Sequence, residues 1–277
     1  MSEKKKVEGS RFLRESKPAL KHLLGILLRE YGYASILAVD SEAKIYSVAA
    51  SGINIGDFGM LCNRGFVIKV YNEGEYAEYS FNKLERDVTE QAQQIIEQIE
   101  ALKKAVPDKL ERIKLGMLED KPLKFSKSTE YEINPFETGA QNIIDKLTAL
   151  RKKGLEADER MLDCTARMSC QKYSKLFLSD CAMSFLARRG NEVKSYFSSA
   201  SNLGGSEILE SLEADIPHSV EMTVALLDSE PMVPGEYDCI CTPEVTGMIV
   251  HEAFGHGVEM DMFAKDRALA KNYVGGY

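Results

Sequence analysis

The chain has 277 residues, a formal net charge of −8 and 44% hydrophobic residues, an ordinary composition for a protein with a buried core. The acidic balance argues against a nucleic-acid-binding surface. No segment approaches the roughly 20 apolar residues of a membrane span, and the first apolar stretch lacks the uninterrupted core of a signal peptide. We therefore expect a cytoplasmic protein of one to three domains that binds neither nucleic acid nor membrane.

The first third of the chain predicts a helix, an antiparallel sheet and a second helix. Leucines between Leu20 and Leu28 recur at helical spacing, so we expect a helix over 11–31. Strands are expected at 33–39, 44–50, 65–72 and 75–81, with a glycine-rich loop at 52–59 and a hairpin turn at 72–74. A second amphipathic helix is expected at 85–105. Together these elements form a first α+β unit over 10–106.

A proline-containing connector at 107–136 leads to a second unit of the same layout, over 137–229. Apolar residues alternate with polar ones from Leu162 to Cys170, which predicts a half-buried strand with Arg167 on its polar side. The other elements expected here are a helix at 138–153 ended by Gly154, strands at 173–179, 182–189 and 192–200, and helices at 206–213 and 218–228. The fold class is therefore α+β, with two consecutive helix–antiparallel sheet–helix units.

The last segment, 230–277, opens with a strand-turn-helix unit that we interpret as the start of a third domain. Residues 236–241 alternate like a strand, and Thr242 and Pro243 suit the N-cap and first turn of a helix. Cys239 and Cys241 lie two residues apart on the expected strand. They are either small side chains of a core strand or additional metal ligands, and we favour the first interpretation.

The hexapeptide HEAFGH at 251–256 carries the chemistry of this segment. Its two histidines and Glu252 are residue types with which zinc peptidases hold a metal and activate water. His251 and His256 are five residues apart, which leaves about 140° between their side chains on a regular α-helix. A single π-type turn would bring both imidazoles to one face. We therefore predict a widened helical turn between Glu252 and His256.

Glu259 follows His256 by three residues and can share its face of a helix. It could orient an imidazole through a hydrogen bond, replace a missing ligand, or be a solvated acid at a helix end. Orientation of the imidazole is the stronger of the two functional interpretations. The other two histidines of the chain, His22 and His218, are expected to be structural.

The sequence around the hexapeptide resembles the TldD/PmbA family, also called modulators of DNA gyrase. The resemblance rests on three stretches, VPGEY at 233–237, TPEVTG at 242–247 and HEAFGHGVE at 251–259. The stretch GFVIKV at 65–70 before a hairpin also fits the family. The detailed similarity covers about 230–262, and the earlier part of the chain resembles the family in layout alone.

The resemblance implies a zinc metallopeptidase of the TldD-like branch that hydrolyses small or unfolded peptides. It implies His251 and His256 as Zn²⁺ ligands and Glu252 as the catalytic general base. The family's third ligand is a cysteine much further toward the C-terminus, so we expect this chain to be an N-terminal portion with an incomplete metal domain, inactive alone. The resemblance also implies a homodimer, or a heterodimer with a PmbA/TldE-like paralogue. The alternative function is a non-catalytic peptide-binding or assembly subunit of such a complex.

Overall fold

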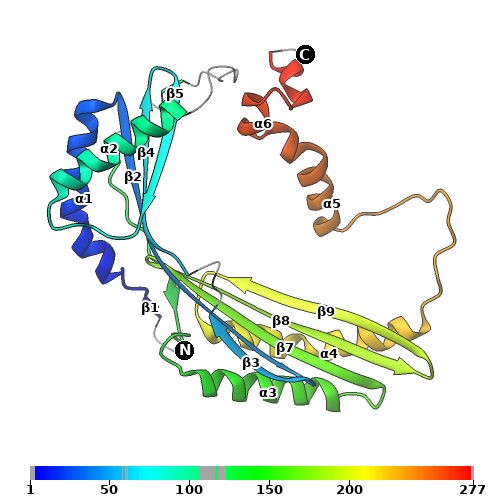
Figure 1. The fold of residues 1–277 in the computed structure, drawn as a ribbon. Helices are drawn as coiled ribbons and strands as arrows, with labels where there is room; N and C mark the ends of the chain where they lie inside the picture. The colour runs from blue at the N-terminus through cyan, green and yellow to red at the C-terminus, as the bar shows by residue number, and fades with distance from the viewer. Residues whose placement is uncertain (1–3, 58, 60–61, 106–115, 118–122, 276–277) are drawn as a thin grey trace.

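The computed structural model describes residues 4–57, 59, 62–105, 116–117 and 123–275. A long bent sheet with helices on its outer side forms the body of the molecule, which comprises residues 4–228 (Figure 1). Residues 229–242 then lead away from the body to a separate helical segment, 243–275, which we call the arm. No helix in the described part of the chain is both long enough and apolar enough to cross a membrane.

One antiparallel sheet of seven strands organises the body. Its strands run in the order β5-β4-β2-β7-β8-β9, and β3 pairs with β2 beside this path. The bounds are β2 (Tyr33–Ala49), β3 (Gly52–Asp57), β4 (Arg64–Asn72), β5 (Glu75–Phe81), β7 (Met161–Tyr173), β8 (Leu176–Arg189) and β9 (Glu192–Asn202). Two short strands, β1 (Lys5–Lys6) and β6 (Glu130–Tyr131), pair separately.

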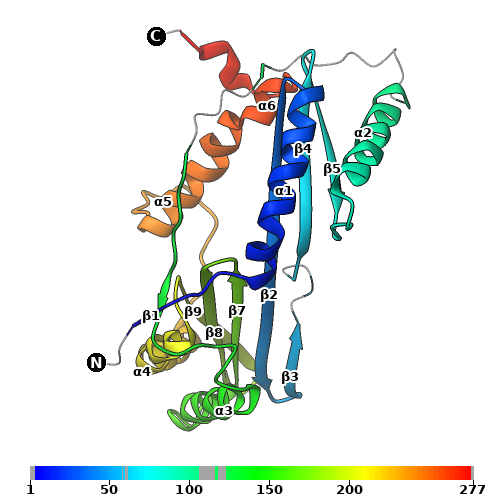
Figure 2. The same ribbon diagram turned by 90° about the vertical axis from the view of Figure 1, so that its left-hand side faces the viewer.

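The first half of the sheet is covered by α1 (Arg11–Glu30) and α2 (Val88–Ala105) (Figure 2). The side chain of Ser10 caps α1 by accepting a hydrogen bond from the backbone N–H of Leu13, over 3.2 Å. Leu23 and Leu27 of α1 are fully buried against Ile68 and the α2 residue Ile99. The leucines that recur at helical spacing on α1 thus pack against every second residue of the strands. This is expected because side chains of a helix share one side every three or four residues, and those of a strand every two.

The second half of the sheet is covered by α3 (Ala140–Glu156) and α4 (Leu209–Ala225), with short 3₁₀ turns η2 (Ser206–Ile208) and η3 (Leu226–Asp228) flanking α4. The alternation expected at 162–170 is confirmed from Cys164 onward, because Cys164, Met168 and Cys170 are buried against these helices, whereas Leu162 is exposed at the register shift between Met161 and Asp163. Burial raises the pKa of the Cys164 and Cys170 thiols to about 12. These cysteines are therefore core residues.

Several boundaries differ from the expectations because packing overrides local signals. The strands expected at 33–39 and 44–50 are one 17-residue strand, β2, whose first half pairs with β4 and whose second half pairs with β7 and β3. The loop expected at 52–59 contains β3. The two helices expected at 206–213 and 218–228 are joined in α4, which continues through Pro217 without a break. β8 likewise joins most of two expected strands.

Gly154 does not end the third helix as expected. It lies inside α3, where an added Cβ would come within 3.0 Å of both Cys164 Sγ and Phe185 Cε1. The absence of a side chain therefore allows α3 to lie close to β7 and β8. The glycine that indicated a helix end in the sequence instead permits close packing of the helix on the sheet.

The two halves of the sheet have separate cores, but β2 contributes to both. Ala34 belongs to the core under α1 and α2, whereas Tyr46 and Val48 belong to the core under α3 and α4. The α+β class is confirmed, with antiparallel pairing throughout the sheet. The division of the chain at 106 and 137 stays a prediction.

The arm consists of α5 (Pro243–Val250), the π-helix η4 (His251–Gly255), the 3₁₀ turn η5 (His256–Val258), α6 (Met260–Ala264) and the 3₁₀ helix η6 (Leu269–Tyr273). The strand expected at 236–241 is absent, since these residues have no regular secondary structure and are exposed. The apolar side of α5 is also exposed, with Met248 at 60% and Ile249 at 53%. No described element covers it.

Candidate metal centre

The helix that carries the hexapeptide begins where the sequence predicts. Thr242 is the N-cap of α5 with an extended backbone, Pro243 occupies the first turn, and Glu244 adds an acidic side chain at the positive end of the helix dipole. The α-helical pattern ends at Val250 and gives way to the π-helix His251–Gly255. The predicted widening of the turn is therefore confirmed.

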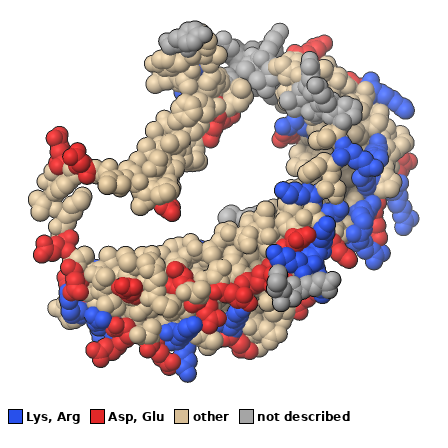
Figure 3. Space-filling view, turned by 180° about the vertical axis from the view of Figure 1, so that it is seen from behind, with Lys and Arg blue, Asp and Glu red and all other residues tan. Residues whose placement is uncertain are grey.

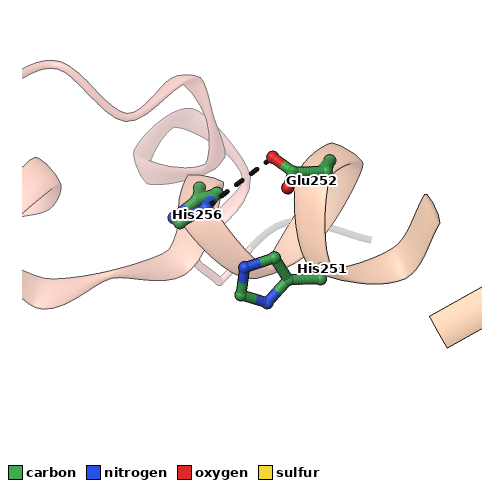
Figure 4. Close-up of side chains that lie close together, drawn as sticks. All are labelled: His251, Glu252 and His256. Atoms are coloured by element: carbon green, nitrogen blue, oxygen red, sulfur yellow. Dashed lines mark ion pairs between the residues drawn. The ribbon is translucent and has the colours of Figure 1, made fainter. Parts of the chain in front are cut away.

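The π-helix brings the two histidines together on one side (Figure 4). Their ring centroids are 4.6 Å apart, and the rings are inclined by 68°. One ligand atom each from His251, Glu252 and His256 can be chosen so that all three lie within 4.8 Å of one another. A regular α-helix would have turned the imidazoles apart, so the extra residue of the motif makes this group possible.

Two carboxylates flank the imidazole of His256. Its Nδ1 lies 2.9 Å from Oε1 of Glu259, and its Nε2 lies 3.7 Å from Oε2 of Glu252. The hydrogen bond that the His256 ring donates to Glu259, with a smaller contribution from the charge of Glu252, raises the pKa of His256 above its usual value. With a proton on Nδ1 donated to Glu259, the neutral ring has its free lone pair on Nε2, on the side of Glu252.

The donor set fits a zinc ion. Zinc accepts imidazole nitrogen and carboxylate oxygen at about 2.0–2.2 Å, which places tetrahedral ligand atoms about 3.4 Å from one another. The present separations of up to 4.8 Å need small side-chain rotations to reach that geometry. All three side chains are exposed, so nothing obstructs such rotations. Carboxylate–imidazole pairing of the kind that His256 makes with Glu259 is the usual support of a metal-binding histidine.

Cys239 and Cys241 take no part in this group. Both are exposed, so the interpretation as core residues is wrong for this structure. The metal-ligand alternative also lacks support, because the eight residues of α5 separate Cys241 from His251 by about 12 Å of helix. Among the described residues, His251, Glu252 and His256 form the one group of three or more potential metal ligands.

The sequence pattern identified every member of the group and the turn that gathers them. It did not identify the approach of Glu252 to Nε2 of His256, although their i, i+4 spacing on a helix could have indicated it. The exposure of the group was also missed. Exposure depends on which other elements cover the arm, and no local pattern reports that.

Comparison with known proteins finds sequence similarity over part of the chain. The sequence is 32% identical over 92 residues to a protein named metalloprotease from Methanothermobacter thermautotrophicus, covering 32% of this chain and 20% of that protein. No family model matches the sequence.

Two solved structures share the fold. A modulator of DNA gyrase from Bacteroides thetaiotaomicron superposes with a TM-score of 0.61 at 15% identity, over 88% of this chain and 57% of that one. A second, from Thermotoga maritima, gives 0.56 at 13% identity, over 79% and 50%. The chain thus spans about half the length of these proteins and a fifth of the metalloprotease. The resemblance to the TldD/PmbA family is confirmed, since the chain has the α+β fold of the modulators of DNA gyrase and shares sequence with a protein named metalloprotease.

Proposed function

We propose that this chain carries the metal-binding helix of a zinc-dependent peptidase of the TldD/PmbA type. The observation that supports this most is the π-helix, which gathers His251, Glu252 and His256 within 4.8 Å. A π turn costs regular hydrogen bonding, and such turns are frequent at functional sites. A metalloprotease-named relative points to the same chemistry.

In this proposal His251 and His256 hold the ion, and Glu252 moves protons. The ion would supply Lewis-acid activation of a peptide carbonyl and of a nucleophilic water. Glu252 takes the proton of the attacking water and passes it to the leaving amine. Glu259 holds Nδ1 of His256, which fixes the tautomer that leaves Nε2 free for the metal.

Two imidazoles do not complete a peptidase zinc site, which ordinarily has three protein ligands and a water. If Glu252 acts as base, the described residues offer no third ligand near the pair. We therefore propose that full activity requires a further ligand from beyond the described residues, and that the chain alone is inactive toward peptides. The partner in this proposal is a second copy or a PmbA/TldE-like paralogue, and the substrates are small or unfolded peptides.

Metal content and turnover test the proposal. Dialysed protein should retain zinc when His251 and His256 are intact and lose most of it in His251→Ala, because one imidazole holds the ion far more weakly than two. In a complex competent to cleave peptides, Glu252→Gln should keep the zinc and lose turnover. Zinc content unaffected by His251→Ala would exclude this site, and peptide cleavage that survives Glu252→Gln would exclude its role as base.

The exposed apolar side of α5 favours a second candidate function, a non-catalytic assembly subunit. Met248 and Ile249 of α5 and Phe254 of the adjoining π-helix are all more than half exposed, which is typical of a surface that a partner covers. Absence of zinc from the assembled complex, together with binding of peptides, would support this candidate over the peptidase.

A further inference from the structure

The concave face of the second half of the sheet is a surface that the metal centre does not use. Helices α3 and α4 lie on one face of β7, β8 and β9, and the opposite face is turned toward α5 (Figure 1). The space between this face and the arm is open in the space-filling view (Figure 3). Side chains on this face are therefore available to a molecule that enters between body and arm.

Arg167 lies near the middle of this open face. It is flanked in register by Ser47 of β2 on one side and by Ala182 of β8 on the other, and Ala182 is in turn opposite Ser199 of β9. The neighbours of Arg167 in sequence, Ala166 and Met168, are buried on the helix-covered face, so Arg167 belongs to the open one. Its side chain is exposed and has no hydrogen-bond or ion-pair partner among the described residues.

Several hydroxyl side chains lie near Arg167 on the same face of the sheet. Directly opposite residues of a sheet lie about 5 Å apart, and diagonal ones about 7 Å. Within that range on the same face are the hydroxyl side chains of Ser47, Thr165 and Ser184, with Ser199 one strand further. The acidic neighbour, Asp180, pairs in register with Ser169 and accepts a hydrogen bond from its hydroxyl. It makes no ion pair with Arg167 within 4.0 Å.

We infer that Arg167 and its hydroxyl neighbours bind the C-terminal carboxylate of a peptide. A guanidinium presents a planar fork of donors that matches a carboxylate, and hydroxyls supply further donors to its oxygens. A single arginine suits a single anionic group, whereas a polyanion would meet the net charge of −8. This inference rests on the proposed function, because it specifies the substrates as peptides with a free C-terminus.

Binding of uncut peptides tests the inference separately from catalysis. The probe is a fluorescein-labelled hexapeptide of alanine, glycine and serine, in three forms: a free acid, a C-terminal amide, and an amide with one internal glutamate. The protein is the full chain carrying Glu252→Gln, so that bound peptide stays intact. The free acid should bind about tenfold more tightly than either amide, because it alone offers the terminal carboxylate.

Arg167→Gln should remove this difference between acid and amide. The matched control is Arg188→Gln, which changes an exposed arginine on the same face of β8 at its far end, opposite Val193, and should leave the difference intact. Circular dichroism verifies that both variants are folded.

Three results would overturn the inference: equal binding of acid and amide, discrimination that persists in Arg167→Gln, or binding of the glutamate-containing amide as tight as that of the acid. The last result would show that the site takes side-chain carboxylates. The two proposals fail separately, because discrimination without any peptidase activity in the assembled complex would leave this inference standing and remove the proposed function.

Discussion

Apolar side chains are largely buried in the body and largely exposed in the arm. In the body, alternate strand residues and helical stripes meet in two cores, and Leu23, Leu147 and Met183 are completely buried. In the arm, Val245, Met248 and Ile249 of α5 also recur at helical spacing but remain exposed. Amphipathic periodicity gives a helix one apolar side, but that side is buried only where a second surface packs against it.

Truncation of an apolar side chain gives the largest expected contrast between the two regions. Leu147→Ala should lower the free energy of unfolding by about 2–5 kcal/mol, because it leaves a cavity between α3 and the sheet. Met248→Ala in the arm should change it by less than about 0.5 kcal/mol, as expected for an exposed position. Denaturant unfolding followed by circular dichroism measures both. A loss for Met248→Ala close to that for Leu147→Ala would mean that the arm packs against another surface in solution.

The pair of Glu259 and His256 gives a smaller effect, confined to the arm. Glu259→Gln should weaken zinc binding at pH 8 by about tenfold to a hundredfold, since the imidazole loses the carboxylate that orients it. Titration with a competing chelator measures this affinity. Asp261→Asn is the control, because Asp261 pairs with Lys265 rather than with a histidine.

The pH dependence of zinc binding sharpens the same prediction. Because Glu259 raises the pKa of His256, protonation of Nε2 begins to compete with zinc binding at a higher pH than it would for an ordinary histidine. Zinc binding should therefore weaken as the pH falls through this raised pKa. In Glu259→Gln the pKa of His256 returns toward its ordinary value, and the loss should occur at lower pH. An unchanged midpoint in the variant would show that Glu259 does not control the protonation of His256.

Cysteine labelling distinguishes body from arm without a change in stability. Cys239 and Cys241, in the segment that leads to the arm, are exposed and should react with a thiol reagent at pH 8 within minutes, as should the exposed Cys62 of the body. Cys164, Cys170 and Cys181 should stay unmodified until the protein unfolds, because burial raises their pKa values to about 12, 12 and 11. Mass spectrometry counts the modified residues. Protection of Cys239 and Cys241 would indicate that residues 236–241 are covered, as the expected strand requires.

Local signals were most successful where the structure depends on neighbouring residues. The start of α5 at Thr242 and Pro243 and the π turn before His256 follow from capping and from spacing, and both are as predicted. Local signals failed where a distant strand or helix decides. Asp40, Ser41 and Glu42 are typical of a break between two strands, yet β2 continues through them. Its pairing with β4 ends at Asp40 and its pairing with β7 begins at Ser41, so hydrogen bonds to neighbouring strands are maintained along the segment.

The sequence by itself determined the helices, most strands, the alternation that buries Cys164 and Cys170, and the widened turn that unites His251, Glu252 and His256. Each of these features depends on contacts between residues close in sequence, or on a periodic pattern that produces one apolar side. Only the tertiary structure decided that β2 serves both halves of the sheet, that Gly154 lies in a helix–sheet contact, and that Arg167 stands on an open concave face. These features depend on which elements far apart in the sequence pack together. A periodic pattern shows that an element has an apolar side, but it does not show which other element packs against that side.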